Sequence, residues 1–238
     1  MHKTLLALAL AAAFAAPAQA VIVTQWNFNS VPPDNILSTG TITPAIGSGT
    51  ASLVGGTTGS FASGAANGGS SDPAPNDNSG WQTTTYAAQG QQNKQRGVQF
   101  AVDTTGWMNI VIGYDLRHSN TSSRYEQVQY SIDGSNFIDI ALFDGNAGDT
   151  WFNGRTVDLS GISGVNNNPN FAFRVVAAFA PNTSAYAASN PTSTYAPTGT
   201  WRFDMVTVQA APIPEPETYA LMLAGLGLVG FMARRRKA

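Results

Sequence analysis

The sequence has 238 residues, of which 43% are hydrophobic and only 11% are charged, and it contains no cysteine. Disulfides, zinc–thiolate sites and cysteine nucleophiles are therefore excluded, and a domain of this size has to be stabilised by its core or by a metal. Residues 21–213 carry seven basic and twelve acidic side chains, a net charge of −5. The basic residues form no cluster along the sequence, so we expect no nucleic-acid partner.

The first twenty residues have the pattern of an export signal. Lys3 provides a positive charge, Leu5 to Ala16 form an apolar run, and Ala18-Gln19-Ala20 supplies small residues at a cleavage position. The run is too short for a permanent membrane span. We therefore expect residues 1–20 to be a helical signal peptide that signal peptidase removes, with an uncleaved anchor as the alternative.

Residues 21–211 are predicted to form one all-β domain. Short runs of β-branched and aromatic residues alternate with turn formers, and no stretch keeps a helical period for three turns. Asp133-Gly134 predicts a tight hairpin turn. We expect two packed antiparallel sheets in a jelly-roll sandwich, with a Greek-key sandwich as the alternative. The nine expected strands cover residues 23–29, 81–86, 97–103, 108–116, 124–132, 137–143, 150–159, 171–179 and 200–208.

Two segments of the domain have no clear strand pattern. Residues 55–80 and 181–199 are rich in small residues and turn formers. Long loops in a compact domain are either functional or mobile. Tyr186 and Tyr195 lie in the second segment, and we expect both rings at the surface, where loop aromatics often take part in recognition. Trp26 and Trp201, within strands, are expected in the core.

The C-terminal part of the sequence combines three features in a fixed order. A linker with a Pro-Glu-Pro tripeptide covers residues 212–217, an apolar run covers residues 218–233, and a basic segment covers residues 234–238. As a helix, sixteen apolar residues span about 24 Å, a little less than the roughly 30 Å of a hydrocarbon core. Because basic residues stay on the cytoplasmic side, we expect a short transmembrane helix with the β domain outside.

This order of features resembles the PEP-CTERM sorting signal of Gram-negative bacteria. The resemblance implies processing by an exosortase, after transient association with the inner membrane. It also implies delivery to the cell surface or the extracellular matrix, with exopolysaccharide as a neighbour. An ordinary C-terminal anchor is the alternative. The matching residues of the tripeptide and the basic segment are Pro214, Glu215, Pro216, Arg234, Arg235 and Arg236.

The β domain also resembles an uncharacterised group of jelly-roll-like domains from secreted bacterial proteins. This resemblance supports the expected fold and implies no activity. The matching segments are residues 26–29, 115–120, 131–137, 157–160 and 201–206.

Two binding sites are predicted in the domain. Asn27 and Asn29 lie in the first expected strand and Asp204 in the last, so they would share an oxygen-only calcium site if these strands are neighbours. Turn formation without a metal is the alternative for such residues. Tyr186 and Tyr195 are the expected glycan-binding residues, because an exposed ring can stack on a sugar.

Catalytic residues are not expected. After the signal peptide the chain has one histidine, His118, and residues 21–213 have one glutamate, Glu126. No Gly-x-Ser-x-Gly motif is present, and a glycosidase needs two opposed carboxylates. We therefore expect a structural or adhesive protein that binds polysaccharide weakly. A secreted hydrolase acting on extracellular polymers is the alternative.

Overall fold

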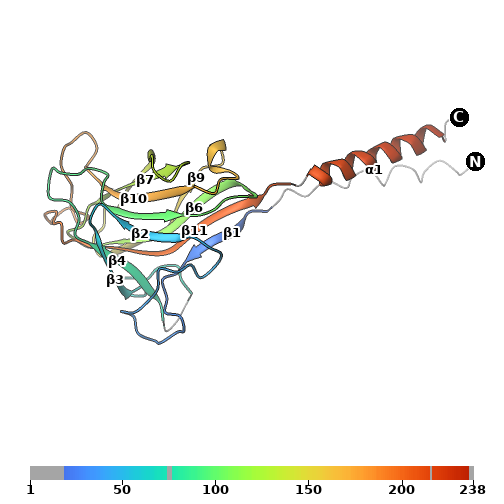
Figure 1. Cartoon of the computed structure of the whole chain (residues 1–238). Coiled ribbons are helices and arrows are strands. Elements are labelled where there is room, and N and C mark those ends of the chain that lie inside the picture. The colour runs from blue at the N-terminus through green and yellow to red at the C-terminus, as the bar shows by residue number, and fades with distance from the viewer. Residues whose placement is uncertain (1–18, 74–76, 215, 236–238) are drawn as a thin grey trace, which may run out of the picture.

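The computed structural model describes residues 19–73, 77–214 and 216–235. Over these residues the chain forms eleven β-strands, one turn of 3₁₀ helix at Ser163–Val165 and one α-helix. Residues 1–18 of the expected signal peptide lie outside the described part of the chain, as do Glu215 and Arg236. The strands form one body, and the helix extends away from the end at which β1 begins and β11 ends (Figure 1).

The first of two antiparallel sheets has six strands. Its order is β3-β4-β11-β6-β9, and β1 also pairs with β11. Because β11 is long, β4 pairs with its first residues and β1 with later ones. The six strands are β1 (Val21–Trp26), β3 (Thr58–Ser63), β4 (Ser79–Thr84), β6 (Trp107–His118), β9 (Thr150–Asp158) and β11 (Trp201–Pro212).

The second sheet has five antiparallel strands in the order β2-β5-β10-β7-β8. The expected hairpin at Asp133-Gly134 joins β7 to β8. Gly134 has a φ of +74°, and the Asp133 carboxylate accepts the backbone N–H groups of Ser135 and Asn136. The strands are β2 (Thr50–Val54), β5 (Gly97–Ala101), β7 (Tyr125–Ser131), β8 (Ile138–Asp144) and β10 (Ala172–Ala178).

The hydrophobic core lies between the two sheets and is rich in aromatic rings. Trp26 and Trp201 are fully buried, as expected. Phe100 of β5 stacks on Phe173 of β10, with ring centroids 5.0 Å apart. It also contacts the ring of Trp26 on the opposite sheet, again at 5.0 Å. These contacts confirm the predicted two-sheet antiparallel sandwich.

All nine expected strands are present, but the sequence interpretation missed β2 and β3. Part of residues 55–80, expected to be irregular, is paired: β3 forms a ladder with β4 from Thr58↔Thr84 to Ser63↔Ser79. Phe61 is the one large side chain of β3. A strand built from small residues has no hydrophobic alternation, so its position is set by its partner strand.

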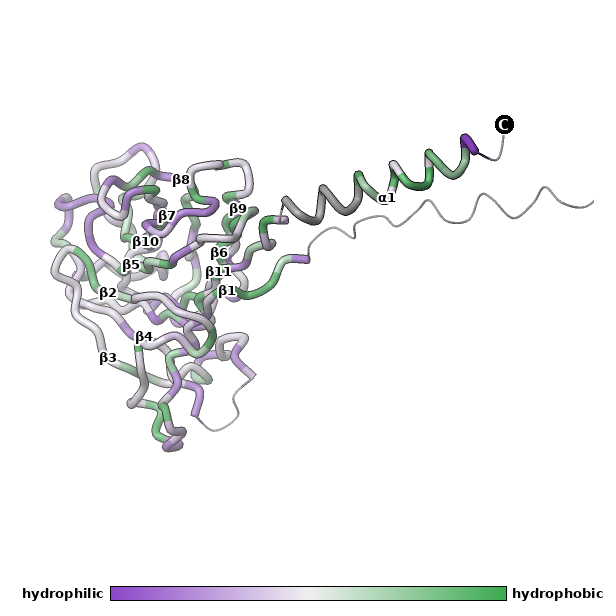
Figure 2. Tube along the Cα trace, turned by 45° about the vertical axis from the view of Figure 1, so that its right-hand side comes forward, coloured by the Kyte–Doolittle hydropathy of each residue, from purple (hydrophilic) through white to green (hydrophobic). Residues whose placement is uncertain are grey.

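The helix α1 (Pro216–Arg235) covers the apolar run expected at residues 218–233. Figure 2 shows its apolar part, which ends in hydrophilic residues. In the described part of the chain, no helix is both long enough and apolar enough to cross a membrane. The assignment of residues 218–233 as a short transmembrane helix stays a prediction.

Candidate functional site

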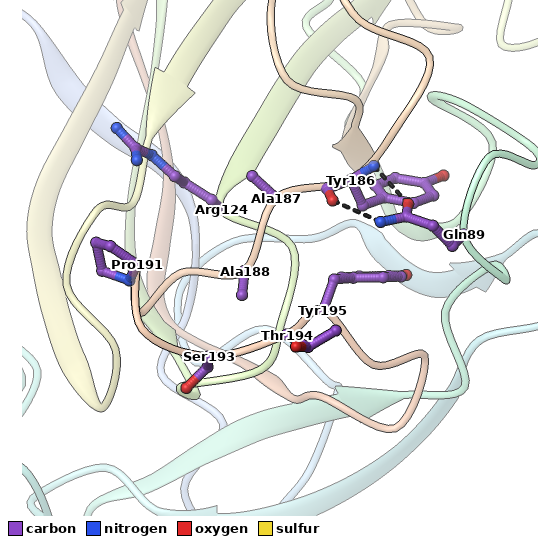
Figure 3. Close-up of a pocket in the computed structure, with 9 residues that line it drawn as sticks. All are labelled: Gln89, Arg124, Tyr186, Ala187, Ala188, Pro191, Ser193, Thr194 and Tyr195. Atoms are coloured by element: carbon purple, nitrogen blue, oxygen red, sulfur yellow. Dashed lines mark hydrogen bonds between the residues drawn. The ribbon is translucent and has the colours of Figure 1, made fainter.

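Tyr186 and Tyr195, the two tyrosines predicted to bind glycans, line one pocket of about 400 Å³ (Figure 3). Gln89 lies next to Tyr186 and exchanges two hydrogen bonds with its backbone, at 2.8 and 2.6 Å. Arg124 lies farther along the wall and forms an ion pair with Asp144, with 2.7 Å between Nη2 and Oδ2. The remaining lining residues are Ala187, Ala188, Pro191, Ser193 and Thr194.

Both tyrosines are part of the wall rather than exposed platforms. Tyr186 is 3% exposed and Tyr195 is 8% exposed, so the prediction of surface rings is wrong. The two rings stack on each other at 4.7 Å. The Tyr186 hydroxyl donates to the carbonyl of Gln91 at 3.0 Å, and the Tyr195 hydroxyl donates to the carbonyl of Ala87 at 2.7 Å. Little ring surface is left for a sugar, and the glycan-binding role of these two residues stays a prediction.

The physical reason is that the loop 181–199 folds onto the segment that contains residues 87–92. Tyr186 packs edge-on against Phe179, with ring centroids 4.6 Å apart. Burial raises the pKa of Tyr186 to about 12. Its hydroxyl therefore stays protonated and continues to donate to the backbone at neutral pH.

The first and last strands are neighbours, as the calcium prediction requires, because Trp26 of β1 pairs with Val206 of β11. Asp204 lies on β11, whereas Asn27 and Asn29 follow the end of β1. Their oxygens, however, already accept protein hydrogen bonds. The Oδ1 of Asn27 accepts the N–H of Asn29 at 3.3 Å, and the Oδ1 of Asn29 accepts the N–H of Ser79 at 2.8 Å. Over residues 19–73, 77–214 and 216–235, no group of three or more His, Cys, Asp or Glu is arranged to hold a metal. The calcium site stays a prediction.

Asp204 is fully buried, and two hydrogen bonds hold its carboxyl group. Ser70 donates its hydroxyl to Oδ2 at 2.6 Å, and the N–H of Met205 donates to Oδ1 at 2.7 Å. Burial raises the pKa of Asp204 well above its ordinary value of 3.8. Burial therefore favours the neutral form of this carboxyl group more than that of an exposed aspartate.

His118 is fully buried, and its Nδ1 lies 2.9 Å from the carbonyl oxygen of Ser123. A carbonyl oxygen can only accept, so Nδ1 carries the proton of this hydrogen bond. The Nε2 atom lies 3.9 Å from the Oε1 of buried Glu126. A ring without solvent-accessible surface does not meet a substrate, so the geometry gives the secreted-hydrolase alternative no support at His118.

A row of polar residues that the sequence analysis missed crosses the outer face of the five-stranded sheet. We call it the polar row. Its members are paired from strand to strand, and Figure 2 shows these strands side by side. The core residues Val98, Phe173 and Val128 are their direct neighbours in sequence and point into the sandwich. Because side chains alternate along a strand, the polar row points outward. Its residues are Ser52, Gln99, Arg174, Gln129 and Asp139.

Hydrogen bonds and one ring contact hold the polar row in place. Arg174 donates from Nε to the Oε1 of Gln99 at 2.8 Å. Its guanidinium carbon lies 3.6 Å from the centroid of the Phe137 ring. At the other end, Gln129 donates from Nε2 to the Oδ1 of Asp139 at 2.9 Å, and Lys94 forms an ion pair with the same carboxylate.

On β5 and β10 the side chains beside the polar row are small or β-branched. On one side β5 and β10 contribute Ala101 and Ala172. On the other side the same strands contribute Gly97 and Val176. Along the polar row itself, Ser52 and Asp139 are exposed, Gln99 and Arg174 are half-buried and Gln129 is buried. The alternation of Gln127 and Gln129 with Val128 predicts that the two glutamines face solvent, but they are only 4% and 8% exposed. The alignment of five strands is not encoded in any one of them.

The C-terminal residues match a known sorting signal. Residues 212–237 match the profile of the PEP-CTERM protein-sorting motif. The chain carries a PEP-CTERM motif. This finding confirms the predicted resemblance and indicates export and sorting to the cell surface. In the motif, Pro214, Arg234 and Arg235 are exposed. No curated protein matches the chain.

Several solved structures share a distant likeness with the chain. The CBM22-1 and GH10 modules of Clostridium thermocellum endo-1,4-β-D-xylanase 10B, complexed with xylohexaose, are 12% identical over 84% of this chain and 30% of that one, with a TM-score of 0.45. The CBM22-1 xylan-binding domain of Paenibacillus barcinonensis Xyn10C is 12% identical over 84% of this chain and 100% of that one, with a TM-score of 0.44. The K2 cleaved adhesin domain of Lys-gingipain is 15% identical over 81% and 97% of the two chains, with a TM-score of 0.40. With TM-scores below 0.5, these likenesses assign neither a ligand nor an activity to this chain.

Proposed function

We propose that the β-sandwich binds an extracellular polysaccharide without cleaving it, and that the outer face of its five-stranded sheet is the binding surface. The PEP-CTERM motif supports this proposal because it indicates delivery to the cell surface, where polysaccharides are available partners. In this proposal an exosortase processes the tail, and the β domain then acts as an adhesive or structural component of the envelope or matrix.

The observation that carries the proposal is the polar row. Four strand spacings of about 4.8 Å give it a length of about 19 Å, which accommodates several sugar rings. Sugar hydroxyl groups both donate and accept hydrogen bonds, and the row offers amide, guanidinium, hydroxyl and carboxylate groups. Among the described residues, nothing bonds to the Nη groups of Arg174, the Nε2 of Gln99 or the Oε1 of Gln129. Gln99 and Arg174 are half-buried, so their free groups are within reach of a ligand, whereas Gln129 is only 8% exposed.

Binding to a panel of soluble polysaccharides, measured by affinity electrophoresis and calorimetry, tests the proposal. We expect the Gln99→Ala/Gln129→Ala double variant to bind at least tenfold more weakly than the wild type, since each lost hydrogen bond to a neutral partner is worth about 1 kcal/mol. Gln209→Ala is the matched control, because Gln209 is an exposed glutamine on β11 of the other sheet.

Two results would count against the proposal. The first is a wild-type protein that binds none of the polysaccharides. The second is a double variant that binds as well as Gln209→Ala. Release of new reducing ends during incubation would instead favour the hydrolase alternative.

A further inference from the structure

Arg174 is a cation with no carboxylate within 4.0 Å in the described part of the chain, as are Arg96 and Arg202. It differs from those two in its hydrogen bonds. Arg96 and Arg202 each donate to a backbone carbonyl and to a glutamine, whereas the guanidinium of Arg174 makes one hydrogen bond, to Gln99. Arg117 and Arg124 each pair with an aspartate. Burial lowers the pKa of Arg174, which shows that its charge is partly desolvated. A half-buried cation without an anion is a site that an anionic ligand would complete.

The ring of Phe137 fixes the orientation of this cation. With 3.6 Å between the guanidinium carbon and the ring centroid, one face of the planar group is covered. The Nε edge is occupied by Gln99. The two Nη groups remain, and two parallel N–H donors match the two oxygens of a carboxylate.

The charges around Arg174 also favour an anion. Lys94 is a second cation at the polar row, and Asp139 is already paired with it and hydrogen-bonded by Gln129. The local charge of these groups is therefore positive, although residues 21–213 together carry a net charge of −5. A ligand held here by its negative charge would bind less tightly at high ionic strength.

From these contacts we propose that the polysaccharide is acidic and that Arg174 binds the carboxylate of a uronic acid residue through its two Nη groups. This inference rests on the proposed polysaccharide-binding function. The amide groups of Gln99 and Gln129 bind sugar hydroxyls on either side of the charged contact.

The test compares two chains of the same sugar that differ in charge. The full protein is titrated with polygalacturonate and with its highly methyl-esterified, nearly neutral form, at low and high salt. We expect the wild type to bind polygalacturonate about tenfold or more tightly than the ester, since a charge-assisted bidentate contact exceeds a neutral hydrogen bond in strength. Arg174→Gln is expected to lose this preference while it retains binding to the ester. Arg174→Lys should keep only part of the preference for polygalacturonate. Lysine carries the positive charge but lacks the two parallel N–H donors of the guanidinium.

Arg117→Gln serves as the matched control. It removes one positive charge from β6 of the other sheet, outside both the polar row and the pocket that contains Tyr186, and should preserve the preference. Circular dichroism and thermal melting verify that each variant is folded. Equal affinity of the wild type for the acid and the ester would overturn the inference and leave the proposed function standing, whereas absence of binding to both would remove both. A preference that Arg174→Gln retains, or that Arg117→Gln loses, would also overturn the assignment to Arg174. The assignment to Arg174 would also fall if the wild type bound dextran sulfate as tightly as polygalacturonate and Arg174→Gln bound dextran sulfate as tightly as the wild type.

Discussion

Glu126 of β7 and Arg155 of β9 form an ion pair that joins the two sheets, with 2.8 Å between Oε1 and Nε. The carboxylate is fully buried. The guanidinium carbon of Arg155 lies 4.8 Å from the ring centroid of Phe143 and 4.7 Å from that of Phe152. The two charged groups therefore depend on each other inside the sandwich.

Removal of the cation alone should be costly. We expect Arg155→Met to lower the free energy of unfolding by about 3–5 kcal/mol, because a buried carboxylate loses its partner. The Glu126→Gln/Arg155→Met double variant should recover much of this loss, since no charge is then buried. Urea denaturation of the purified proteins measures both effects, and a change below about 1 kcal/mol for Arg155→Met would contradict the argument.

Phe100 is the centre of the aromatic core, because its ring contacts Trp26, Trp81 and Phe173. Phe100→Ala should lower the free energy of unfolding by about 3–5 kcal/mol through lost burial and the cavity that remains. Val31→Ala is the control, because Val31 is 80% exposed and should change stability by less than about 0.5 kcal/mol. Equal midpoints for the two variants in urea would show that Phe100 does not organise the core.

The pH dependence of stability should contain a contribution from Asp204. Its pKa is raised on folding, so the folded state binds more protons than the unfolded state above pH 3.8, the ordinary value. Stability is therefore greatest below that pH and decreases as pH rises toward the pKa of the folded state. In a calcium-free buffer, Asp204→Asn should be more stable than the wild type at pH 7, and the difference should shrink near pH 4. Thermal melting across this range is the measurement, and parallel curves for the two proteins would refute the expectation.

The predicted calcium site at Asn27, Asn29 and Asp204 can be tested on the same proteins. If calcium binds there, a concentration one hundredfold above the dissociation constant adds about 2.7 kcal/mol of stability, which raises the melting temperature by several degrees. Chelation should reverse this increase in the wild type and have no effect on Asp204→Asn. Identical melting of the wild type in calcium and in chelator would remove the calcium prediction.

The PEP-CTERM motif predicts a change in the mass of the mature protein. We expect the wild type, isolated from its native host, to lack the segment after the tripeptide. Substitution of Pro214, Glu215 and Pro216 by alanine should preserve that segment and shift the protein to the membrane fraction. Gln209→Ala, outside the motif, should behave as the wild type. Intact mass and fractionation give the answer, and a wild-type protein that keeps residues 218–238 would favour an ordinary anchored protein.

The sequence could predict the features that repeat locally. Alternation such as that of Val128 and Gln129 identified the strands, and Asp133-Gly134 identified a hairpin. It could not predict the surroundings of Tyr186 and Tyr195. A loop rich in small residues gives no sign of which segment it will pack against, and their burial follows from contact with residues distant in the chain.

The sequence by itself determined the fold class, the composition of the core strands and the sorting motif, because hydrophobic periodicity and short motifs are properties of neighbouring residues. Only the tertiary structure decided that Ser52, Gln99, Arg174, Gln129 and Asp139 stand in line. Strand register fixes that alignment, and register depends on pairing between segments far apart in the chain. For the same reason the missing partner of Arg174 becomes visible only when every charged group has been placed in space.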